Sequence, residues 1–253
     1  MTYGLGMLVE DGLVMIADTR TNAGIDDISV YRKLHLVASG PDRLLVAITA
    51  GNLSVTQSIL STLAEGLPPT EEGGPPRRLS DAPSMFRAAQ LVGEAVVRAR
   101  EAIAGGAAAE GVRTGVSLLL GGRIGHDRLR LYLFYAPGNF IECQRDKPFL
   151  QVGDTKYGKP VLDRSLRHDM ALDEAVKLGL ISFDSTMRSN LSVGRPLDLV
   201  VIPRDAEQPV VSRRIGEQDS YFDDLSMRWG MLLDEVRATI PPPPFMVPDA
   251  TPR

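Results

Sequence analysis

Short apolar segments separated by turn residues dominate the first fifty positions of the chain. Residues 3–9 and 13–17 are apolar and flank Asp11-Gly12, a pair that typically forms the tight turn of a β-hairpin. Residues 34–38 and 44–50 form a second apolar pair around a Gly-Pro-Asp turn. The pattern therefore predicts that the chain opens with two antiparallel strand pairs.

The apolar period changes at residue 53, where side chains begin to recur at helical spacing. This predicts a helix from residue 53, with Asn52 as its N-cap. A second helix is predicted over 83–104, ending at Gly105-Gly106. The intervening residues 66–82 are rich in Pro, Gly and Glu and favour an exposed loop.

The second half of the chain repeats this alternation of strands and helices. Strands are predicted at 115–120, 129–136, 140–143, 149–152, 197–202 and 209–215, and helices at 157–167, 172–187 and 219–240. Runs of strands alternating with pairs of helices favour two sheets sandwiched between helical layers. We expect one domain over residues 1–240 and a Pro-rich tail over 241–253, which is predicted to be an extended arm because four consecutive prolines cannot continue a helix.

Composition narrows the possible partners. The net charge of −4 and the absence of a basic cluster argue against nucleic acid, and no apolar run approaches the ~20 residues that span a bilayer. We therefore expect neither nucleic acid nor membrane as a partner. The first residues lack the pattern of a signal peptide, which predicts a cytoplasmic protein.

The chain's sulfur and histidine side chains indicate neither a metal site nor a cofactor. Cys143 is the only cysteine, so an intrachain disulfide and a thiolate metal cage are excluded; a buried apolar role is expected for it. The three histidines are scattered and none has metal-ligand spacing. The segment 153–159 matches the first part of a phosphate-binding loop, but Pro160 stands where that motif needs Ser or Thr. We expect no cofactor and no metal.

Thr2 is the strongest candidate for chemistry. If Met1 is removed, this residue carries both a hydroxyl nucleophile and a free α-amine, whose ordinary pKa of about 7.7–8.0 lets it act as a base near neutral pH. The predicted hairpin places Asp18 at the same end as Thr2. The alternative interpretations are an ordinary threonine at a frayed terminus and an aspartate that caps a turn.

Two further candidates follow the second strand of this hairpin. Lys33 begins a predicted strand, and its ammonium would favour the nucleophilic forms of Thr2; the alternative is a solvated lysine. Gly51 lies where a strand passes into a helix, and a helix N-terminus offers the amides and positive dipole that an oxyanion needs. A glycine required only for a positive φ is the alternative there.

The order and spacing of Thr2, Asp18, Lys33 and Gly51 resemble the catalytic elements of proteasome β-subunits. Three longer strings, residues 17–24 (ADTRTNAG), 153–160 (GDTKYGKP) and 183–194 (FDSTMRSNLSVG), are similar to the Anbu (ancestral β-subunit) proteasome-type protease family. The resemblance covers most of residues 2–240. It implies an α+β fold, the four-layer αββα sandwich of N-terminal-nucleophile hydrolases, made of two mostly antiparallel sheets between helical layers.

The resemblance also assigns roles and shows where the chain departs from the β-subunit pattern. It implies Asp18 and Lys33 as the catalytic aspartate and lysine, a charge pair beside Thr2, and Gly51 as the oxyanion donor. Lys33 lies 31 positions after Thr2 instead of 32, and Arg32 is an adjacent competitor.

β-Subunits carry a second Ser/Asp/Ser set near the threonine amine. Its first serine is replaced here, with Asp154 as a candidate substitute. Asp184 and Ser189 are the nearest candidates for the other two members, and Arg188 competes with them.

The function implied is that of a proteasome-like threonine peptidase or amide hydrolase acting through an acyl-enzyme on Thr2. The resemblance further implies a homo-oligomer, in a ring or an open helical assembly, with exposed helices such as 83–104 as candidate contacts; any unfoldase partner is unidentified. Two alternatives are a non-proteolytic amidase acting on a small amide and a catalytically silent scaffold subunit.

Overall fold

A computed structural model describes residues 2–22, 28–110, 114–206 and 209–246. The chain divides into two compact units, residues 1–217 and 218–253, which are described separately. The assignment of residues 1–240 to one domain stays a prediction.

The first sheet of the larger unit carries the N-terminal hairpin at its centre. Its strands lie in the order β10 (Phe149–Gly153), β1 (Tyr3–Val9), β2 (Gly12–Asp18), β11 (Leu197–Pro203) and β12 (Val211–Ile215). Every neighbouring pair is antiparallel. The predicted hairpin is confirmed, because Val9 pairs with Gly12 and Gly4 with Ala17. Its turn is Glu10-Asp11, one residue earlier than predicted, and Gly12 is the first residue of β2.

A second antiparallel sheet contains the other predicted strand pair. Its order is β5 (Leu34–Gly40), β6 (Arg43–Gly51), β7 (Val116–Ile124), β8 (Arg130–Phe134) and β9 (Phe140–Glu142). Each strand lies beside its neighbour in sequence; the connections are short except between β6 and β7, which the segment carrying α1 and α2 joins.

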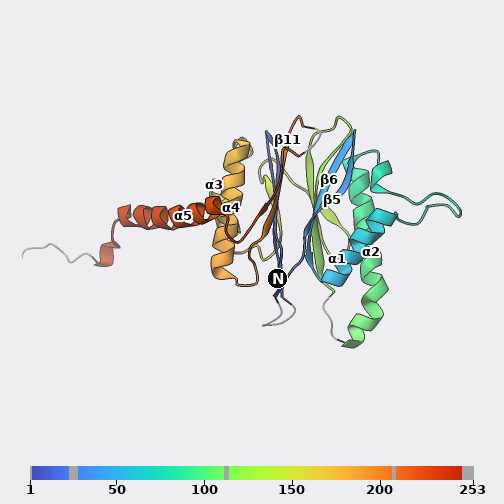
Figure 1. Cartoon of the computed structure of the whole chain (residues 1–253), viewed down its shortest axis with the longest axis horizontal. Helices are drawn as coiled ribbons and strands as arrows, with labels where there is room; N and C mark the ends of the chain where they lie inside the picture. Colours follow the sequence, from blue (N-terminus) through green and yellow to red (C-terminus); the bar gives the residue numbers. More distant parts are fainter. Residues whose placement is uncertain (1, 23–27, 111–113, 207–208, 247–253) are drawn as a thin grey trace, which may run out of the picture. The chain divides into compact units, whose positions relative to one another are not determined.

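Helices cover the outer face of each sheet, so that the layers run helix, sheet, sheet, helix (Figure 1). One pair consists of α1 (Leu53–Glu65) and α2 (Met85–Glu110), and the other of α3 (Lys159–Ser165) and α4 (Leu172–Ser189). The expected α+β class and the αββα sandwich are confirmed. The predicted N-cap is also confirmed: Asn52 accepts a hydrogen bond from the Val55 amide at 3.2 Å.

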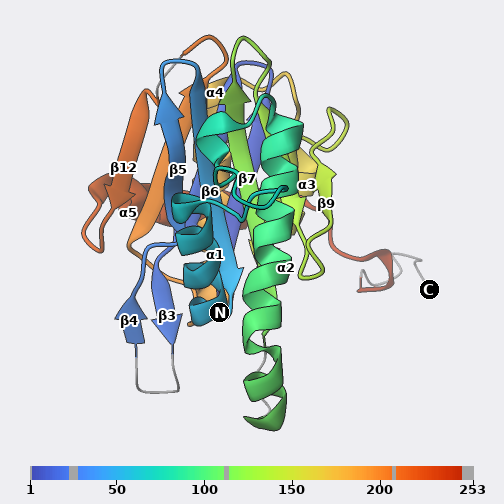
Figure 2. The same ribbon diagram turned by 90° about the vertical axis from the view of Figure 1, so that its right-hand side faces the viewer.

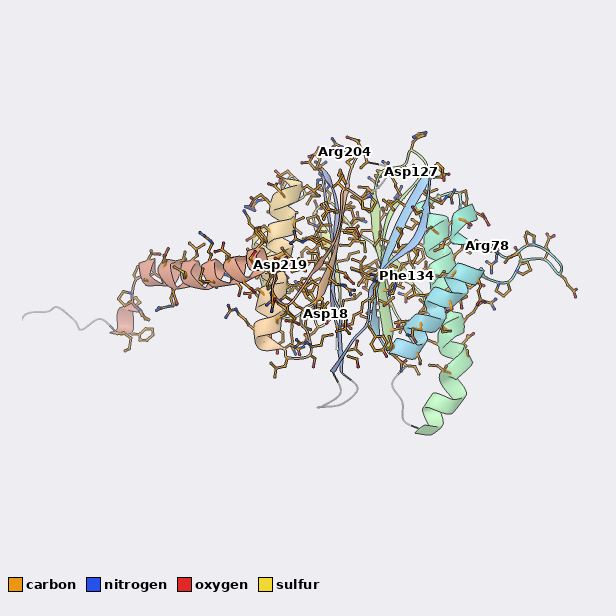
Figure 3. The ribbon with its side chains drawn as sticks, viewed as in Figure 1. Asp18, Arg78, Asp127, Phe134, Arg204 and Asp219 are labelled. Atoms are coloured by element: carbon orange, nitrogen blue, oxygen red, sulfur yellow. The ribbon has the colours of Figure 1, made fainter. Side chains whose placement is uncertain are left out.

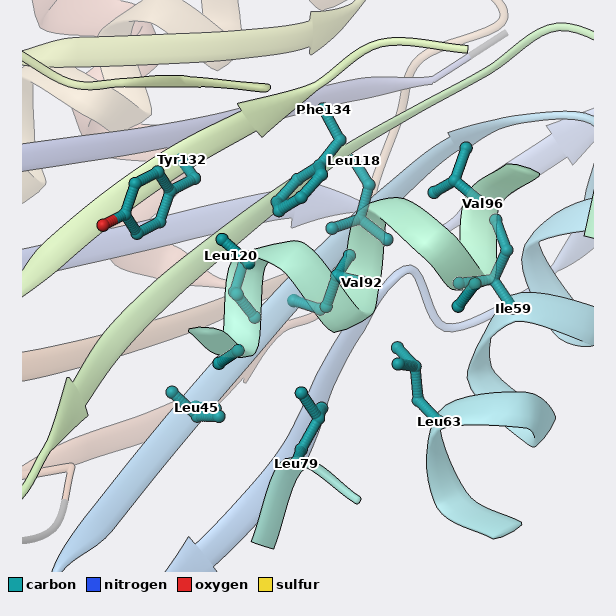
Figure 4. Packing of buried hydrophobic residues seen from close by; sticks show 14 of the residues in the cluster. Leu45, Ile59, Leu63, Leu79, Val92, Val96, Leu118, Leu120, Tyr132 and Phe134 are labelled. Atoms are coloured by element: carbon teal, nitrogen blue, oxygen red, sulfur yellow. The ribbon is translucent and has the colours of Figure 1, made fainter. Parts of the chain in front are cut away.

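Two apolar cores hold the layers together. The first lies between the second sheet and α1 and α2, where Ile59, Val92 and Phe134 are fully buried (Figure 4). The second lies between the two sheets and includes Met15, Ile48 and Leu119. Burial of a large apolar side chain contributes about 1.5–3 kcal/mol, so these cores supply the main driving force for the arrangement.

Three local features differ from what the sequence predicted. Helix α2 continues through Gly105-Gly106 to Glu110, because the surrounding alanines are the best helix formers and offset the ~1 kcal/mol cost of each glycine. The 66–82 loop is not simply exposed: Leu67 and Leu79 are buried, and a 3₁₀ turn, η1, forms at Leu79–Asp81. Leu67 and Leu79 belong to the apolar core, which the mainly polar composition of this loop did not indicate.

The third is a short hairpin, β3 (Arg20–Asn22) with β4 (Ile28–Val30), which no pattern predicted. It projects from the same end of the molecule as the N-terminus (Figure 2). Its strands are short, and β3 is polar, so the apolar alternation that marks a strand is absent.

The smaller unit consists of α5 (Ser220–Thr239) and a 3₁₀ turn, η2 (Pro244–Met246). Asp219 caps α5 by accepting from the Phe222 amide at 3.0 Å. The expectation of a wholly extended tail was wrong, since η2 interrupts it; residues 247–253 lie outside the described residues. No helix in the described part of the chain has the length and apolar character needed to cross a membrane.

Candidate active site

The backbone of Thr2 is held firmly at the start of β1. Thr2 is only 8% exposed, and its carbonyl oxygen accepts a hydrogen bond from the Asp154 amide at 2.7 Å. Gly153 lies directly against it: this glycine has φ +81°, and an added Cβ would come within 1.9 Å of the Thr2 oxygen. Only glycine therefore permits this approach.

Asp18 is hydrogen-bonded both to β1, the strand that follows Thr2, and to Lys33. Its carboxylate is fully buried, and Oδ1 accepts hydrogen bonds from the Tyr3 amide at 3.0 Å and from Lys33 Nζ at 2.9 Å. Lys33 is 5% exposed and also donates to the Arg20 carbonyl. The predicted proximity of the two hairpin ends is thus confirmed, and the sheet brings Lys33 to the same point.

Burial moves the pKa values of both charged groups against their charged forms. Desolvation raises the pKa of Asp18, and the Lys33 ammonium only partly opposes this. Desolvation likewise lowers the pKa of Lys33, with Asp18 opposing it. The second carboxylate oxygen, Asp18 Oδ2, is buried and has no hydrogen-bond partner in the described part of the chain. The pair is therefore ionised over a narrower pH range than in water.

Lys33, and not its neighbour Arg32, points into the site. The Arg32 side chain is 66% exposed and approaches Asp198 at 3.9 Å. The buried contact of Lys33 with Asp18 and the exposed position of Arg32 thus separate the two cations.

Gly51 lies at this end of the second sheet. Its neighbour Ala50 packs in the same intersheet core as Ala17 and Leu34, the neighbours of Asp18 and Lys33. Gly51 has φ +112°, and a Cβ there would lie 2.2 Å from the Gly115 oxygen, so a glycine is required whatever its chemistry. The Asn52 amide is already bonded to that same oxygen at 3.0 Å.

The two candidates from α4 have different surroundings. Asp184 is 3% exposed and accepts a hydrogen bond from Nε of Arg188, the competing candidate, at 3.1 Å. Ser189 is the last residue of α4 and is exposed. Their assignment to a second catalytic set stays a prediction.

Asp154 and Asn190 form a hydrogen-bonded polar pair next to the Thr2 backbone. The Asp154 side chain is 8% exposed and accepts a hydrogen bond from Asn190 Nδ2, while its backbone amide holds the Thr2 carbonyl. Asn190 is also the C-cap of α4. Asp154 was a candidate from its place in the sequence, whereas Asn190 was not predicted; the position of Asn190 just after a helix was the available signal.

A second polar contact behind the strand was also missed. The Tyr3 hydroxyl is hydrogen-bonded to Ser182 Oγ at 2.7 Å and accepts from Gln151 Nε2 at 2.6 Å. Burial raises the pKa of Tyr3 to about 12, so the phenol is neutral. The ring also contacts Phe183 at 4.5 Å between centroids. Residues from β10 and α4 thus fix the residue that follows the candidate nucleophile.

Other reactive groups in the described residues do not form a rival centre. No cluster of three or more His, Cys, Asp or Glu side chains suitable for a metal occurs among them. Burial raises the pKa of the Cys143 thiol to about 12, which leaves it protonated and unreactive at neutral pH.

Proteins similar to this chain are found among solved structures. No protein-family model matches the chain, and no curated protein matches it. Anbu (ancestral beta-subunit) from Yersinia bercovieri superposes with a TM-score of 0.85 at 43% identity, covering 94% of this chain and 97% of that one.

Two further structures are equally similar. A Gly-1 mutant of Anbu from Hyphomicrobium sp. strain MC1 gives a TM-score of 0.86 at 45% identity, over 96% of this chain and 99% of that one. The helical assembly of the Anbu complex from Pseudomonas aeruginosa gives 0.85 at 42% identity, over 96% and 98%. The similarity therefore spans nearly the whole of each chain.

Proposed function

The chain belongs to the Anbu family of proteasome-like proteins, and from this premise we propose that it is a threonine peptidase or amide hydrolase whose nucleophile is Thr2, exposed as the N-terminal residue after removal of Met1. The observation that carries the proposal is the buried Asp18 carboxylate. It binds the amide that follows Thr2 and the Lys33 ammonium at the same oxygen. Removing a charged pair from water is costly unless hydrogen bonds compensate it fully, and Asp18 Oδ2 has no partner among the described residues. A pair kept at such a cost supports a functional role for it.

The first chemical step is attack of Thr2 Oγ on the carbonyl carbon of an amide. The hydroxyl proton passes to the α-amine of the same residue, directly or through one water. The nearby Lys33 ammonium lowers the pKa of that amine and of the hydroxyl, which favours the nucleophilic forms at neutral pH. Asp18 orients the ammonium and holds the β1 backbone.

The second step is collapse of the tetrahedral intermediate. The carbonyl oxygen carries the negative charge, and the Gly51 amide is the proposed donor to it; such a donor typically contributes about 2.7–4 kcal/mol. The C–N bond breaks, the protonated Thr2 amine gives its proton to the departing amine, and an ester on Thr2 remains. Water then attacks this ester, with the same amine as base, and releases the acid.

We also propose that the protein acts as a self-assembled homo-oligomer in the cytoplasm. A relative that is 42% identical forms a helical assembly. In this chain, α5 presents exposed large apolar side chains, which a lone molecule would leave in water. A peptide or other amide is the proposed substrate.

The decisive experiment is intact-mass spectrometry of the native protein before and after treatment with a peptide epoxyketone, which reacts with both the hydroxyl and the amine of an N-terminal threonine. We expect Met1 to be absent and one inhibitor to be bound at Thr2. Thr2→Ala should abolish labelling and amide turnover. Thr70→Ala, an exposed threonine on a loop, is the matched control and should retain both.

The remaining outcomes separate the alternatives. Retention of Met1 in all of the native protein would leave no free amine at Thr2, and the chain would then be a silent scaffold subunit. Labelling of Thr2 with turnover of small amides but of no peptide would indicate the amidase. Turnover that survives Thr2→Ala would contradict the nucleophile assignment.

A further inference from the structure

A cavity of about 390 Å³ lies at the end of the sandwich opposite Thr2. Its walls come from the turn after β1 and from the segments before β8, after β9 and after β11. Seven residues of strand at ~3.4 Å each place Val9 roughly 24 Å from Thr2. Figure 3 shows Arg204, which lines the cavity, at the opposite end from Asp18. The cavity is therefore separate from the candidate active site.

Three arginines line this cavity, and their contacts with other residues leave part of their positive charge uncompensated. Arg145 makes no ion pair or hydrogen bond with any residue that the structure describes. The Arg204 guanidinium has Asp205 at 3.7 Å, but that carboxylate is 88% exposed, so the pair contributes little. Arg128 approaches Glu142 at 3.7 Å, and the same carboxylate oxygen is already bonded to Arg130 at 2.7 Å.

His168 also lines the cavity. Its carbonyl accepts a hydrogen bond from the Glu10 amide at 2.7 Å, which fixes the loop that carries the ring. Its Nδ1 atom is shielded from water and has no hydrogen-bond partner among the described residues, so this atom does not face the open cavity and is not an expected contact for a ligand there.

The other lining groups limit what the cavity can bind. Leu8 and Leu129 provide apolar surface, which fits the carbon part of a small molecule. Two carboxylates, Glu10 and Glu142, also line the cavity and oppose an anion, but the three lining arginines outnumber them. Arg128 shares Glu142 with Arg130, and Arg204 Nη1 donates only to the neutral Glu10 carbonyl at 3.4 Å, so the guanidinium groups of Arg145 and Arg204 are the expected contacts. Planar guanidinium groups bind carboxylate and phosphate oxygens in a bidentate way. A volume near 400 Å³ is in the range of small-ligand sites.

We propose that this cavity is a binding site for a small oxyanion, a phosphate or a polycarboxylate, held by the guanidinium groups of Arg145 and Arg204. The proposal is independent of the function proposed for Thr2, because no residue is shared between the two sites.

The test is isothermal titration calorimetry of the intact protein with inorganic phosphate and, separately, with citrate, at an ionic strength held constant with chloride. We expect saturable binding of at least one of them in the low millimolar range or tighter. Arg145→Gln and Arg204→Gln should each weaken the affinity about tenfold or more, since a hydrogen bond to a charged group is lost. Arg87→Gln, on an exposed part of α2, is the matched control and should leave it unchanged.

The two titrants identify the chemistry of the ligand: a preference for phosphate indicates a phosphorylated compound, and a preference for citrate a carboxylate. Absence of saturable binding with both would overturn the proposal. An equal loss in Arg87→Gln would also overturn it, because the effect would then reflect net charge only. Thermal unfolding of each variant without ligand verifies that the fold is intact.

Discussion

Asp18 and Lys33 illustrate how the environment of single residues sets their chemistry. Both are charged types that are rarely buried, yet they are 0% and 5% exposed. Removal of one partner from such a pair typically costs about 3–5 kcal/mol, because the other charge stays buried without compensation. A substitution that keeps the charge is therefore the sharper probe of function.

The pKa shifts of this pair predict the pH dependence of activity. The pKa of Asp18 is raised, so as pH falls this carboxylate becomes protonated at a pH above its ordinary pKa of 3.8. The pKa of Lys33 is lowered, so as pH rises this ammonium loses its proton at a pH below its ordinary pKa of 10.5. We expect kcat/KM to follow a bell that lies inside these values: Lys33 sets the alkaline limb, and the acid limb also reflects the Thr2 α-amine, which must be neutral to act as the base. Lys33→Arg should lower the rate but move the alkaline limb to higher pH, since a guanidinium stays protonated.

Steady-state kinetics across pH with a fluorogenic peptide amide would measure both limbs. Lys177→Arg, which changes an exposed lysine of α4, is the control and should leave the profile unchanged. An alkaline limb that does not move in Lys33→Arg would show that another group limits the rate at high pH.

At the scale of elements, the contact between β1, β10 and α4 holds the candidate nucleophile in place. The Tyr3 hydroxyl of β1 is hydrogen-bonded to Gln151 of β10 and to Ser182 of α4. Gly158, at the start of α3, packs directly against the Tyr3 hydroxyl and Ser182 Oγ. A Cβ at Gly158 would come within 2.3 Å of Ser182 Oγ and 2.5 Å of the Tyr3 hydroxyl. This explains why a glycine occupies that position of the GDTKYGKP string.

Gly158→Ala should therefore separate Tyr3 from Ser182. Its backbone angles, φ −82° and ψ −28°, suit alanine, so any loss comes from crowding and not from backbone strain. We expect a loss of about 1–3 kcal/mol in unfolding free energy, typical of overpacking, together with reduced turnover. Thermal unfolding at matched concentration would measure the first and amide hydrolysis the second.

Gly216→Ala is the matched control for this substitution, because a Cβ there meets nothing within 4 Å. It should leave both stability and turnover unchanged. Equal stability of Gly158→Ala and the parent protein would show that the Tyr3 contact can rearrange freely and does not fix β1.

At the scale of the whole molecule, exposed apolar side chains on α5 favour self-assembly. Leu232, Leu233 and Val236 are 51%, 51% and 59% exposed and recur at helical spacing. Exposed apolar patches of this kind mark interaction surfaces. The earlier suggestion of the 83–104 helix as a contact stays a prediction, whereas α5 offers the larger set of exposed apolar groups.

The double substitution Leu232→Glu and Val236→Glu should shift the protein from large assemblies to small species. Two carboxylates in an apolar contact must be desolvated without partners, which opposes association. Light scattering coupled to size-exclusion chromatography would measure the masses. Asp234→Lys, which changes the charge of α5 without altering its apolar side chains, should keep the assembly; an unchanged mass in the double variant would exclude this face of α5 as a contact.

Much of the fold and part of the site follow from the sequence by itself. The hairpin at Asp11-Gly12, the switch to a helix at Asn52 and the strand–helix order depend on turn chemistry and on periods of 2 and 3.6, which neighbours in the chain determine. Register in that hairpin was enough to bring the ends carrying Thr2 and Asp18 together. Thr2, Lys33 and Gly51 were identified as candidates because their residue types and order matched a known pattern.

Only the tertiary structure decided how these candidates are surrounded. Tyr3 and Ser182 are 179 positions apart, and no local pattern reports that their hydroxyl groups meet. The same holds for Asp154 with Asn190 and for the burial that shifts the pKa values of Asp18 and Lys33. Desolvation and long-range hydrogen bonds arise from the packing of whole layers, so they are properties of the folded molecule and not of any segment within it.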